Sequence, residues 1–308
     1  MKKIIGLALS AWLALPTFAL AQTTEQHLGV LIMAHGGIED WEKGVLDTVA
    51  PLQQDYAMEV AFGMADAVSI QEAVTRLEAR GVNQIAVVRL FISGESWYER
   101  TAQILGMQEG APAREPMAQH GHGAHGQDEN AQAMAMMGHS MEFWKVDSQA
   151  RFALSKPGLA EAPQIAEVLL TRASELSQNP EQEDVLILAH GPEDDAENAR
   201  WLAQIDERAN NIRTHMNFRH VQVATLREDW EDKRVEAEAF VRAYVENANN
   251  TGAKALVIPY RVHGFGPYAQ VLEGLEYTAN ERGLIPHPGV TAWIIEQIAV
   301  LKAELQEQ

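Results

Sequence analysis

The sequence contains no cysteine, and this absence excludes several functions at once. A chain without thiols forms no disulfides, offers no thiolate to a metal, has no cysteine nucleophile and cannot be lipid-anchored as a lipoprotein. Basic residues are scarce as well, since 24 Lys and Arg face 43 Asp and Glu, which gives a formal net charge of −19. Such a surface repels phosphates, so we expect no nucleic-acid partner.

Familiar catalytic motifs are also missing. The sequence has no glycine-rich phosphate loop, no G-x-S-x-G nucleophile elbow and no H-E-x-x-H zinc helix. Beyond the N-terminal region it has no apolar run long enough to cross a bilayer, so we expect no membrane partner for the mature protein. Candidate chemistry therefore rests on histidine, methionine and carboxylate side chains.

The one isolated apolar run, residues 4–15, has the features of an export signal. Two lysines precede it, a proline ends it, and Ala19 and Ala21 supply the small residues of a cleavage site. The run is too short to span a bilayer, which takes about 20 residues. We expect residues 1–21 to be a signal peptide and the mature protein to be periplasmic.

The rest of the chain alternates between apolar runs of strand length and helical patterns. Apolar runs without polar alternation are typical of parallel strands that are covered on both faces. We expect strands at residues 28–34, 59–63, 84–92, 184–189, 220–226 and 255–262, and helices at residues 39–54, 69–80, 197–213, 232–249, 268–282 and 293–305. This order predicts an α/β fold with parallel sheets.

Two parts of the sequence resemble each other. LIMAHG and LILAHG differ at one position and place His35 and His190 at equivalent points, while RLFISGES and PYRVHGFG end the later strand of each part. We predict two tandem domains, at residues 26–106 and 151–308, that are copies of one unit. Residues 107–150 between them are rich in Gly, Ala, Gln and Met without a helical period, and predict a flexible insert.

Four polar residues follow predicted strands: His35, Glu95, His190 and His263. In open α/β sheets, ligands bind outside the carboxyl ends of the strands, where these side chains should gather. A single histidine there more often hydrogen-bonds a loop carbonyl, but two at equivalent positions favour a functional role. A histidine with a carboxylate or a second histidine can bind a divalent metal or move protons at neutral pH.

The insert supplies a second group of candidate metal ligands. Imidazoles suit Cu, Zn, Ni and Co, and thioethers favour Cu(I). The alternative is a linker whose histidines and methionines are incidental, and we prefer metal binding because four of the 11 histidines fall within 20 residues. The candidates are His120, His122, His125, His139, Met134, Met136, Met137 and Met141.

The repeated strand ending in A-H-G, the segment EARGVNQIAVVRLFISG and the histidine-rich insert together resemble the CbiX/sirohydrochlorin cobaltochelatase family. The resemblance implies a type II chelatase fold, with two flavodoxin-like domains that face a cleft and hold a tetrapyrrole between them. His35 and His190 match the family's first histidine. At the place of its second histidine this chain has Ser96 and Gly266, and His263 is the substitute we expect.

The resemblance implies a lyase-type enzyme that inserts a divalent metal into a sirohydrochlorin-type tetrapyrrole, as in cobalamin biosynthesis. Co²⁺ is the first choice, with Ni²⁺, Cu and Zn²⁺ as alternatives. The histidines would bind the metal and take up pyrrole protons, with Glu95 as an auxiliary carboxylate. Arg89, Arg100 and Arg261 would pair with the carboxylates of the tetrapyrrole. The alternative is a non-catalytic periplasmic protein that binds or delivers metal through the insert.

Overall fold

The computed structural model describes residues 27–114 and 140–307. Its elements, in chain order, are β1 (Leu28–Ala34), α1 (Glu39–Val49), η1 (Ala50–Leu52), β2 (Ala57–Phe62), α2 (Ala67–Glu78), β3 (Gln84–Leu90), α3 (Tyr98–Ile104), β4 (Arg151–Leu154), η2 (Leu159–Glu161), α5 (Ile165–Leu176), η3 (Pro180–Gln182), β5 (Glu183–Ala189), α6 (Asp195–His215), β6 (His220–Thr225), α7 (Glu231–Asn250), β7 (Lys254–Tyr260), α8 (Tyr268–Val271), β8 (Thr278–Ala279) and α9 (Pro288–Glu307). The signal peptide and most of the insert lie outside the described residues.

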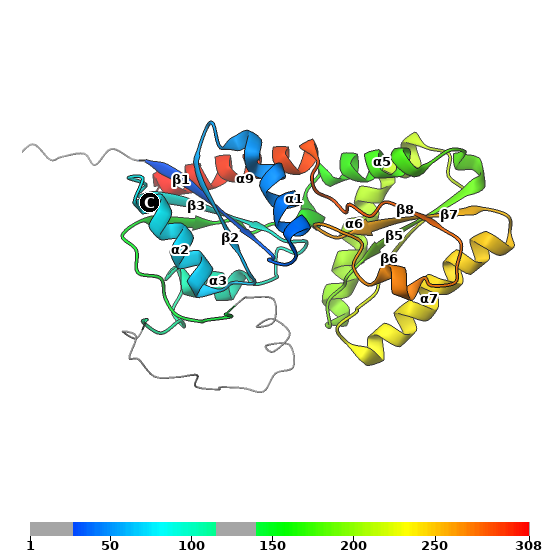
Figure 1. Cartoon of the computed structure of the whole chain (residues 1–308), viewed down its shortest axis with the longest axis horizontal. Helices are drawn as coiled ribbons and strands as arrows, with labels where there is room; N and C mark the ends of the chain where they lie inside the picture. The colour runs from blue at the N-terminus through cyan, green and yellow to red at the C-terminus, as the bar shows by residue number, and fades with distance from the viewer. Residues whose placement is uncertain (1–26, 115–139, 308) are drawn as a thin grey trace, which may run out of the picture.

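The strands form two four-stranded sheets with one order. The first sheet runs β2-β1-β3-β4 and the second β6-β5-β7-β8, and every pairing is parallel. This 2-1-3-4 order is the beginning of the flavodoxin-like arrangement. The predicted α/β fold with two parallel sheets is therefore confirmed, and Figure 1 shows the two sheets following one another along the long axis of the molecule.

The apolar runs form the central strands because helices cover both faces of each sheet. All seven residues of β3 and all seven of β5 are buried, as expected for parallel strands without a solvent-facing side. Two apolar cores belong to one sheet each. A third contains residues of both sheets together with α5 and α9, so the two units share part of their core.

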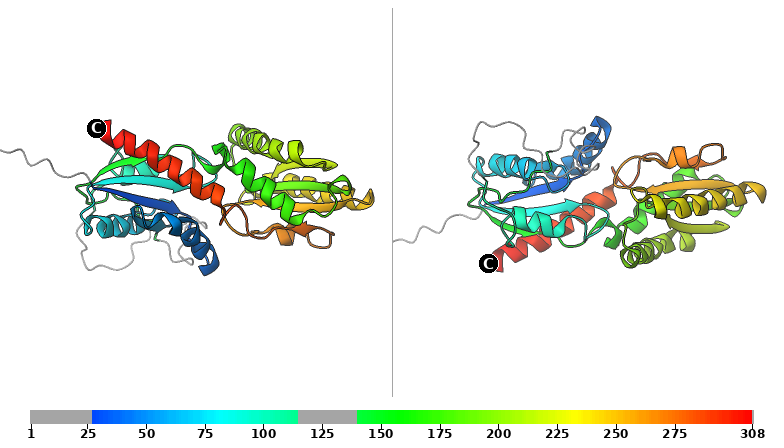
Figure 2. Two further views of the ribbon diagram at one scale, coloured as in Figure 1. Left: turned by 90° about the horizontal axis from the view of Figure 1, so that it is seen from above. Right: turned by 90° about the horizontal axis from the view of Figure 1, so that it is seen from below.

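Residues 151–308, predicted as one C-terminal domain, divide between the two sheets. Strand β4 extends the first sheet, where Ala86 of β3 pairs with Ala153. The last helix, α9, returns to pack on β3 and β4, and Gln84 Nε2 donates to the carbonyl of Leu305 at 3.2 Å. Both views in Figure 2 show α9, in red, lying along the first sheet. The chain therefore passes between the units twice, once before α5 and once before α9.

The end of the predicted flexible insert is packed rather than free. Trp144 and Val146 are buried in the core of the first unit. The backbone N–H of Glu142 donates to Asp66 Oδ1 at 3.0 Å, and Asp66 also caps α2 by accepting from the backbone of Ser69 at 3.1 Å. The cap of α2 is thus Asp66, whereas the sequence pattern suggested that Ser69 begins this helix.

Other predicted boundaries also change. The helix predicted for residues 268–282 is wrong: α8 ends at Val271, and the chain then turns through Gly274, at φ +82°, into strand β8. The helices α3 and α5 and the strand β4 were not predicted. Helix α3 and strand β4 are short, whereas α5 has 12 residues with buried positions at helical spacing and was missed. Within the described residues, no helix combines the length and the apolar character needed to cross a membrane.

Candidate functional site

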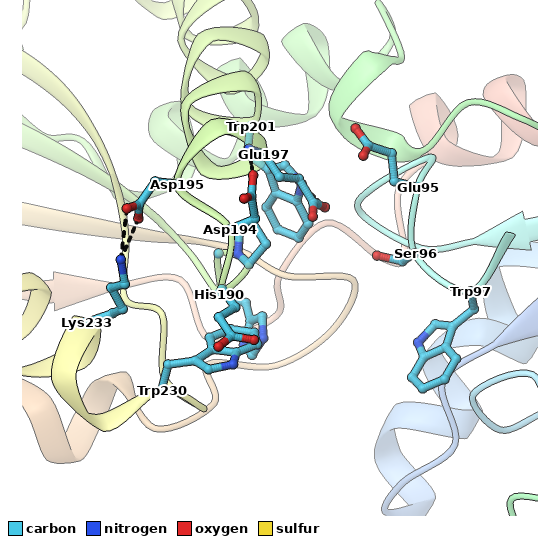
Figure 3. Close-up of a pocket in the computed structure, with 13 residues that line it drawn as sticks. Glu95, Ser96, Trp97, His190, Asp194, Asp195, Glu197, Trp201, Trp230 and Lys233 are labelled. Carbon is cyan, nitrogen blue, oxygen red and sulfur yellow. Dashed lines mark hydrogen bonds and ion pairs between the residues drawn. The ribbon is translucent and has the colours of Figure 1, made fainter. Parts of the chain in front are cut away.

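A cavity of about 850 Å³ lies between the two units, where the loops after β3 and β5 face each other. Figure 3 shows Glu95, Ser96 and Trp97 of the first unit on one side and His190, Trp201 and Trp230 of the second on the other. The carboxyl ends of parallel strands are the usual place for a ligand in this kind of fold. The complete lining is Glu95, Ser96, Trp97, His190, Gly191, Pro192, Glu193, Asp194, Asp195, Glu197, Trp201, Trp230 and Lys233.

His190 enters this cavity between two carboxylates. Its Nδ1 lies 2.8 Å from Glu228 Oε1 and its Nε2 lies 3.2 Å from Asp229 Oδ2, while its ring meets the edge of Trp230 at 5.8 Å. Burial alone would lower the pKa of His190, but hydrogen bonds to Asp229 and Glu228 outweigh it and raise the pKa to about 9. At neutral pH this histidine is an imidazolium with both nitrogens engaged.

Glu228, which contacts His190, also holds Arg261, one of the arginines predicted to bind the ligand. Arg261 Nη1 lies 2.6 Å from Glu228 Oε1, and its guanidinium stands over the ring of Tyr268 at 5.6 Å. Burial raises the pKa of Glu228, but hydrogen bonding by His190 and the charge of Arg261 reverse this and lower it. One charge network therefore contains Arg261, Glu228, His190 and Asp229. In it, Arg261 is paired with Glu228 rather than left available for a ligand.

His35 and His263 meet around a tryptophan of α1. The ring centroid of Trp41 lies 5.6 Å from that of His35 and 5.8 Å from that of His263. His263 reaches over from the second unit because residue 44 is glycine: a Cβ there would come within 2.6 Å of the His263 ring. Burial lowers the pKa of His263, although the charge of Asp40 opposes the shift, so its imidazole is neutral at pH 7.

Glu95 forms an ion pair that bridges the two units. Arg200 of α6 grips it through both carboxylate oxygens, with Nη2 at 3.0 Å from Oε1 and 2.9 Å from Oε2. Both side chains are about half exposed or more, at 60% and 51% for Glu95 and Arg200. The predicted auxiliary carboxylate therefore lines the cavity with His190, but an arginine neutralises it.

The other two predicted ligand-binding arginines hold the backbone instead. Arg89 is fully buried and donates to four backbone carbonyls, among them those of Gly94 at 2.8 Å and Ser96 at 2.6 Å. Arg100 donates to the carbonyls of Ala65 at 3.0 Å and Met141 at 2.7 Å. Burial lowers the pKa of Arg89 to about 10, which leaves it charged at neutral pH.

The predicted metal ligands of the insert cannot be placed, because His120, His122, His125, His139, Met134, Met136 and Met137 lie outside the described residues. Met141 is described, and its carbonyl accepts from Arg100. In the part of the chain that the structure describes, no three His, Asp or Glu side chains are grouped to hold a metal ion. His35 and His263 share Trp41, whereas His190 and Glu95 share the cavity.

The sequence patterns did not single out the aromatic lining of the cavity. Trp97, Trp201 and Trp230 all line it, although nothing in their local sequence marks a site. The carboxylate partners of His190 were missed as well. A usable signal was the position of Glu228 and Asp229, separated by one residue from the predicted strand 220–226, at the same sheet edge as His190.

No protein-family model matches the chain, and no curated protein matches its sequence. Solved structures do match. A structure of SirB from Bacillus subtilis with Fe3+ shares 13% identity and a TM-score of 0.58, over 92% of this chain and 98% of that one. The sirohydrochlorin chelatase SirB from Bacillus subtilis subspecies spizizenii in complex with cobalt shares 12% identity and a TM-score of 0.55, over the same shares.

A third similar structure is a multi-domain protein from Deinococcus radiodurans, described as having structural similarity to chelatases and two additional novel domains. It shares 15% identity and a TM-score of 0.52, over 89% of this chain. The chain spans 55% of the length of that protein. At these identities the likeness concerns the fold: this chain has the α/β fold of chelatase structures, with two parallel four-stranded sheets flanked by helices.

Proposed function

We propose that the chain is a chelatase-like protein that binds a tetrapyrrole between its two units and inserts a divalent metal, with Co²⁺ as the first candidate. The observation that carries the proposal is the cavity between the facing carboxyl ends of the two sheets, with a histidine after the first strand of each. Its support from known proteins is the fold, shared with two sirohydrochlorin chelatase structures over nearly their full length.

The histidines divide into two chemical types. Metal insertion releases the two N–H protons of the macrocycle for each M²⁺ that enters, so the site needs neutral bases. His263, which lies beside Trp41 and outside the cavity lining, is neutral at pH 7 because burial lowers its pKa, and it can accept a proton or offer a lone pair. His190 is already protonated and hydrogen-bonded to two carboxylates, so it suits an electrostatic role better than that of a metal ligand.

Insertion is tested by mixing the mature protein with sirohydrochlorin and Co²⁺ and following the absorbance change. We expect a rate above the protein-free control, and at least a tenfold loss in His263→Ala. His215→Ala is the matched control, because His215 lies exposed at the end of α6 and hydrogen-bonds to the carbonyl of Asn211 one turn earlier in the same helix. A rate equal to the protein-free control would refute the enzymatic proposal.

A second candidate function, binding or delivery of a metal ion without insertion, is favoured by the charge of the cavity. Its lining contains the carboxylates of Glu95, Glu193, Asp194, Asp195 and Glu197. Arg200 and Lys233 pair with Glu95 and Asp195, but Glu193, Asp194 and Glu197 keep the wall acidic, so it attracts cations and repels a polycarboxylate. Under this proposal the histidines and methionines of the insert supply the main site.

Calorimetric titration of Co, Ni, Cu and Zn separates the two candidates. The titration is carried out on the wild type and on a variant that lacks part of the insert. That variant should lack residues 115–139 alone, since residues 140–150 pack against the first unit. Loss of binding on deletion, with unchanged binding in the double variant His35→Ala and His190→Ala, supports metal delivery. Unchanged metal binding in the variant that lacks residues 115–139 would mean that the insert does not contain the metal site.

We further propose that the protein acts in the periplasm, on the basis of the signal-like residues 1–21. The proposal predicts that protein recovered from the periplasmic fraction begins at Gln22. N-terminal sequencing of that material tests it. Full-length chain found only in the cytoplasmic fraction would contradict it.

A further inference from the structure

Resting on the proposed function, we propose that Trp97 and Trp230 form the two aromatic walls between which the tetrapyrrole macrocycle stacks. Trp97 belongs to the loop after β3 in the first unit, and Trp230 precedes α7 in the second. In Figure 3 their rings lie on opposite sides of the cavity. Both indoles are only partly buried, so each offers ring surface to a ligand.

The backbone holds Trp97 in a conformation that its side chain does not favour. Its φ is +61° and its ψ is 10°, in the left-handed region that bulky residues rarely adopt. The carbonyl of Trp97 accepts hydrogen bonds from the backbone and the hydroxyl of Thr101, at 2.9 and 2.6 Å. Residues held in this way are enriched at ligand clamps.

Buried Arg89 fixes the loop that carries Trp97. Its guanidinium donates to the carbonyls of Gly94 and Ser96 in that loop, and to those of Ser155 and Lys156 behind it. Four of the five N–H donors of this buried guanidinium are thus engaged by backbone carbonyls, and the planar group holds them in a rigid fork. The position of Trp97 is therefore set before a ligand arrives, which lowers the entropy cost of binding.

The opposite wall is also fixed. Trp230 lies edge-on to the His190 ring at 5.8 Å, and its carbonyl accepts from the backbone of Arg234 at 2.8 Å. Trp201 completes this side, with its indole N–H bonded to Glu197 Oε1 at 3.1 Å. Both walls are thus anchored by the structure of their own unit.

A flat macrocycle suits this cavity better than a compact or flexible ligand. The volume of about 850 Å³ is within the range of small-molecule sites. Aromatic faces on two opposing sides bind planar π systems by stacking, largely without regard to the substituents at the ring edge. The acidic residues of the lining do not attract a carboxylated ligand. Stacking on the indole rings therefore has to supply the binding energy.

The test measures binding of metal-free sirohydrochlorin, so that it does not depend on metal insertion. The variant Trp97→Asn removes the ring while suiting the left-handed backbone, which asparagine tolerates. We expect its Kd to be about tenfold weaker than that of the wild type, Trp97→Phe to stay within about threefold, and Trp230→Leu to weaken binding from the other wall. The control is Trp144→Phe, in the core of the first unit outside this cavity.

The outcomes separate this inference from the proposed function. Weaker binding in Trp97→Asn and in Trp230→Leu, with an unchanged control, supports the aromatic walls. Wild-type binding that neither variant alters overturns the walls and leaves metal insertion standing. A wild-type protein that does not bind the probe overturns both. Circular dichroism melts show whether each variant is folded. If Trp97→Asn is not folded, the binding measured for Trp230→Leu tests the aromatic walls.

Discussion

The charge network of His190 predicts that stability falls as the pH rises above neutrality. The imidazolium lies between Glu228 and Asp229, at 2.8 and 3.2 Å, and these hydrogen bonds raise its pKa to about 9 against the opposing effect of burial. A free histidine has a pKa near 6.5. The folded state therefore holds this proton more tightly than the unfolded chain does.

The size and sign of the effect follow from these two values. A difference of one pKa unit between the folded and unfolded states corresponds to about 1.36 kcal/mol. A pKa of about 9 in the folded state, against about 6.5 in the unfolded chain, therefore corresponds to about 3 kcal/mol of stability. Partial exposure of the ring lets solvent screen the interaction, so we expect about 2 kcal/mol. Because the folded pKa is raised, this stability is fully present below pH 6.5 and is lost as the pH rises through 9.

The assay compares the wild type with His190→Gln, whose side chain does not titrate. The free energy of unfolding, from denaturant titration, is measured for both at pH 6 and pH 10, with His215→Gln as the exposed control. We expect the wild type to lose about 2 kcal/mol more than His190→Gln between these pH values. A difference that is independent of pH, or an NMR titration of the His190 ring centred near 6.5, would refute the reasoning.

Three further changes test other parts of the structure. Arg89→Lys leaves buried carbonyls without donors, and we expect a loss of at least about 3 kcal/mol in the free energy of unfolding. Gly44→Ala gains about 1 kcal/mol of helix propensity but crowds the His263 ring at 2.6 Å, so denaturant titration should show a net loss of about 1 kcal/mol. Glu95→Gln removes the exposed pair with Arg200, and its melting curve should show a change of less than about 1 kcal/mol.

Much of the fold could be predicted because the central strands are buried on both faces. A parallel strand such as β5 is a continuous apolar run, which stands out from its surroundings in the sequence. The return of α9 to the first sheet could not be predicted in this way. An amphipathic helix shows that one of its faces is buried, but its sequence does not say against which sheet.

The candidate site was predicted less completely, for a physical reason. A histidine after a strand can be located from the sequence, and the sheet edge then places His35, His190 and His263 at the facing ends of the two units. Whether a charged side chain faces a ligand or the protein depends on its partners, which come from distant parts of the chain. Arg89 and Arg261 look available for a ligand in the sequence, yet backbone carbonyls and Glu228 occupy them.

This use of the arginines leads to a prediction about salt. Five carboxylates line the cavity, while Lys233 and Arg200 are paired with Asp195 and Glu95. A polycarboxylate tetrapyrrole is therefore held by stacking against a net repulsion, and salt should screen that repulsion. The Debye length falls from about 30 Å at 0.01 M salt to about 10 Å at 0.1 M. We expect sirohydrochlorin to bind more tightly as NaCl rises over this range, in fluorescence titrations of the wild type. Weaker binding at higher salt would mean that basic groups hold the carboxylates, and the stacking argument would then lose its basis.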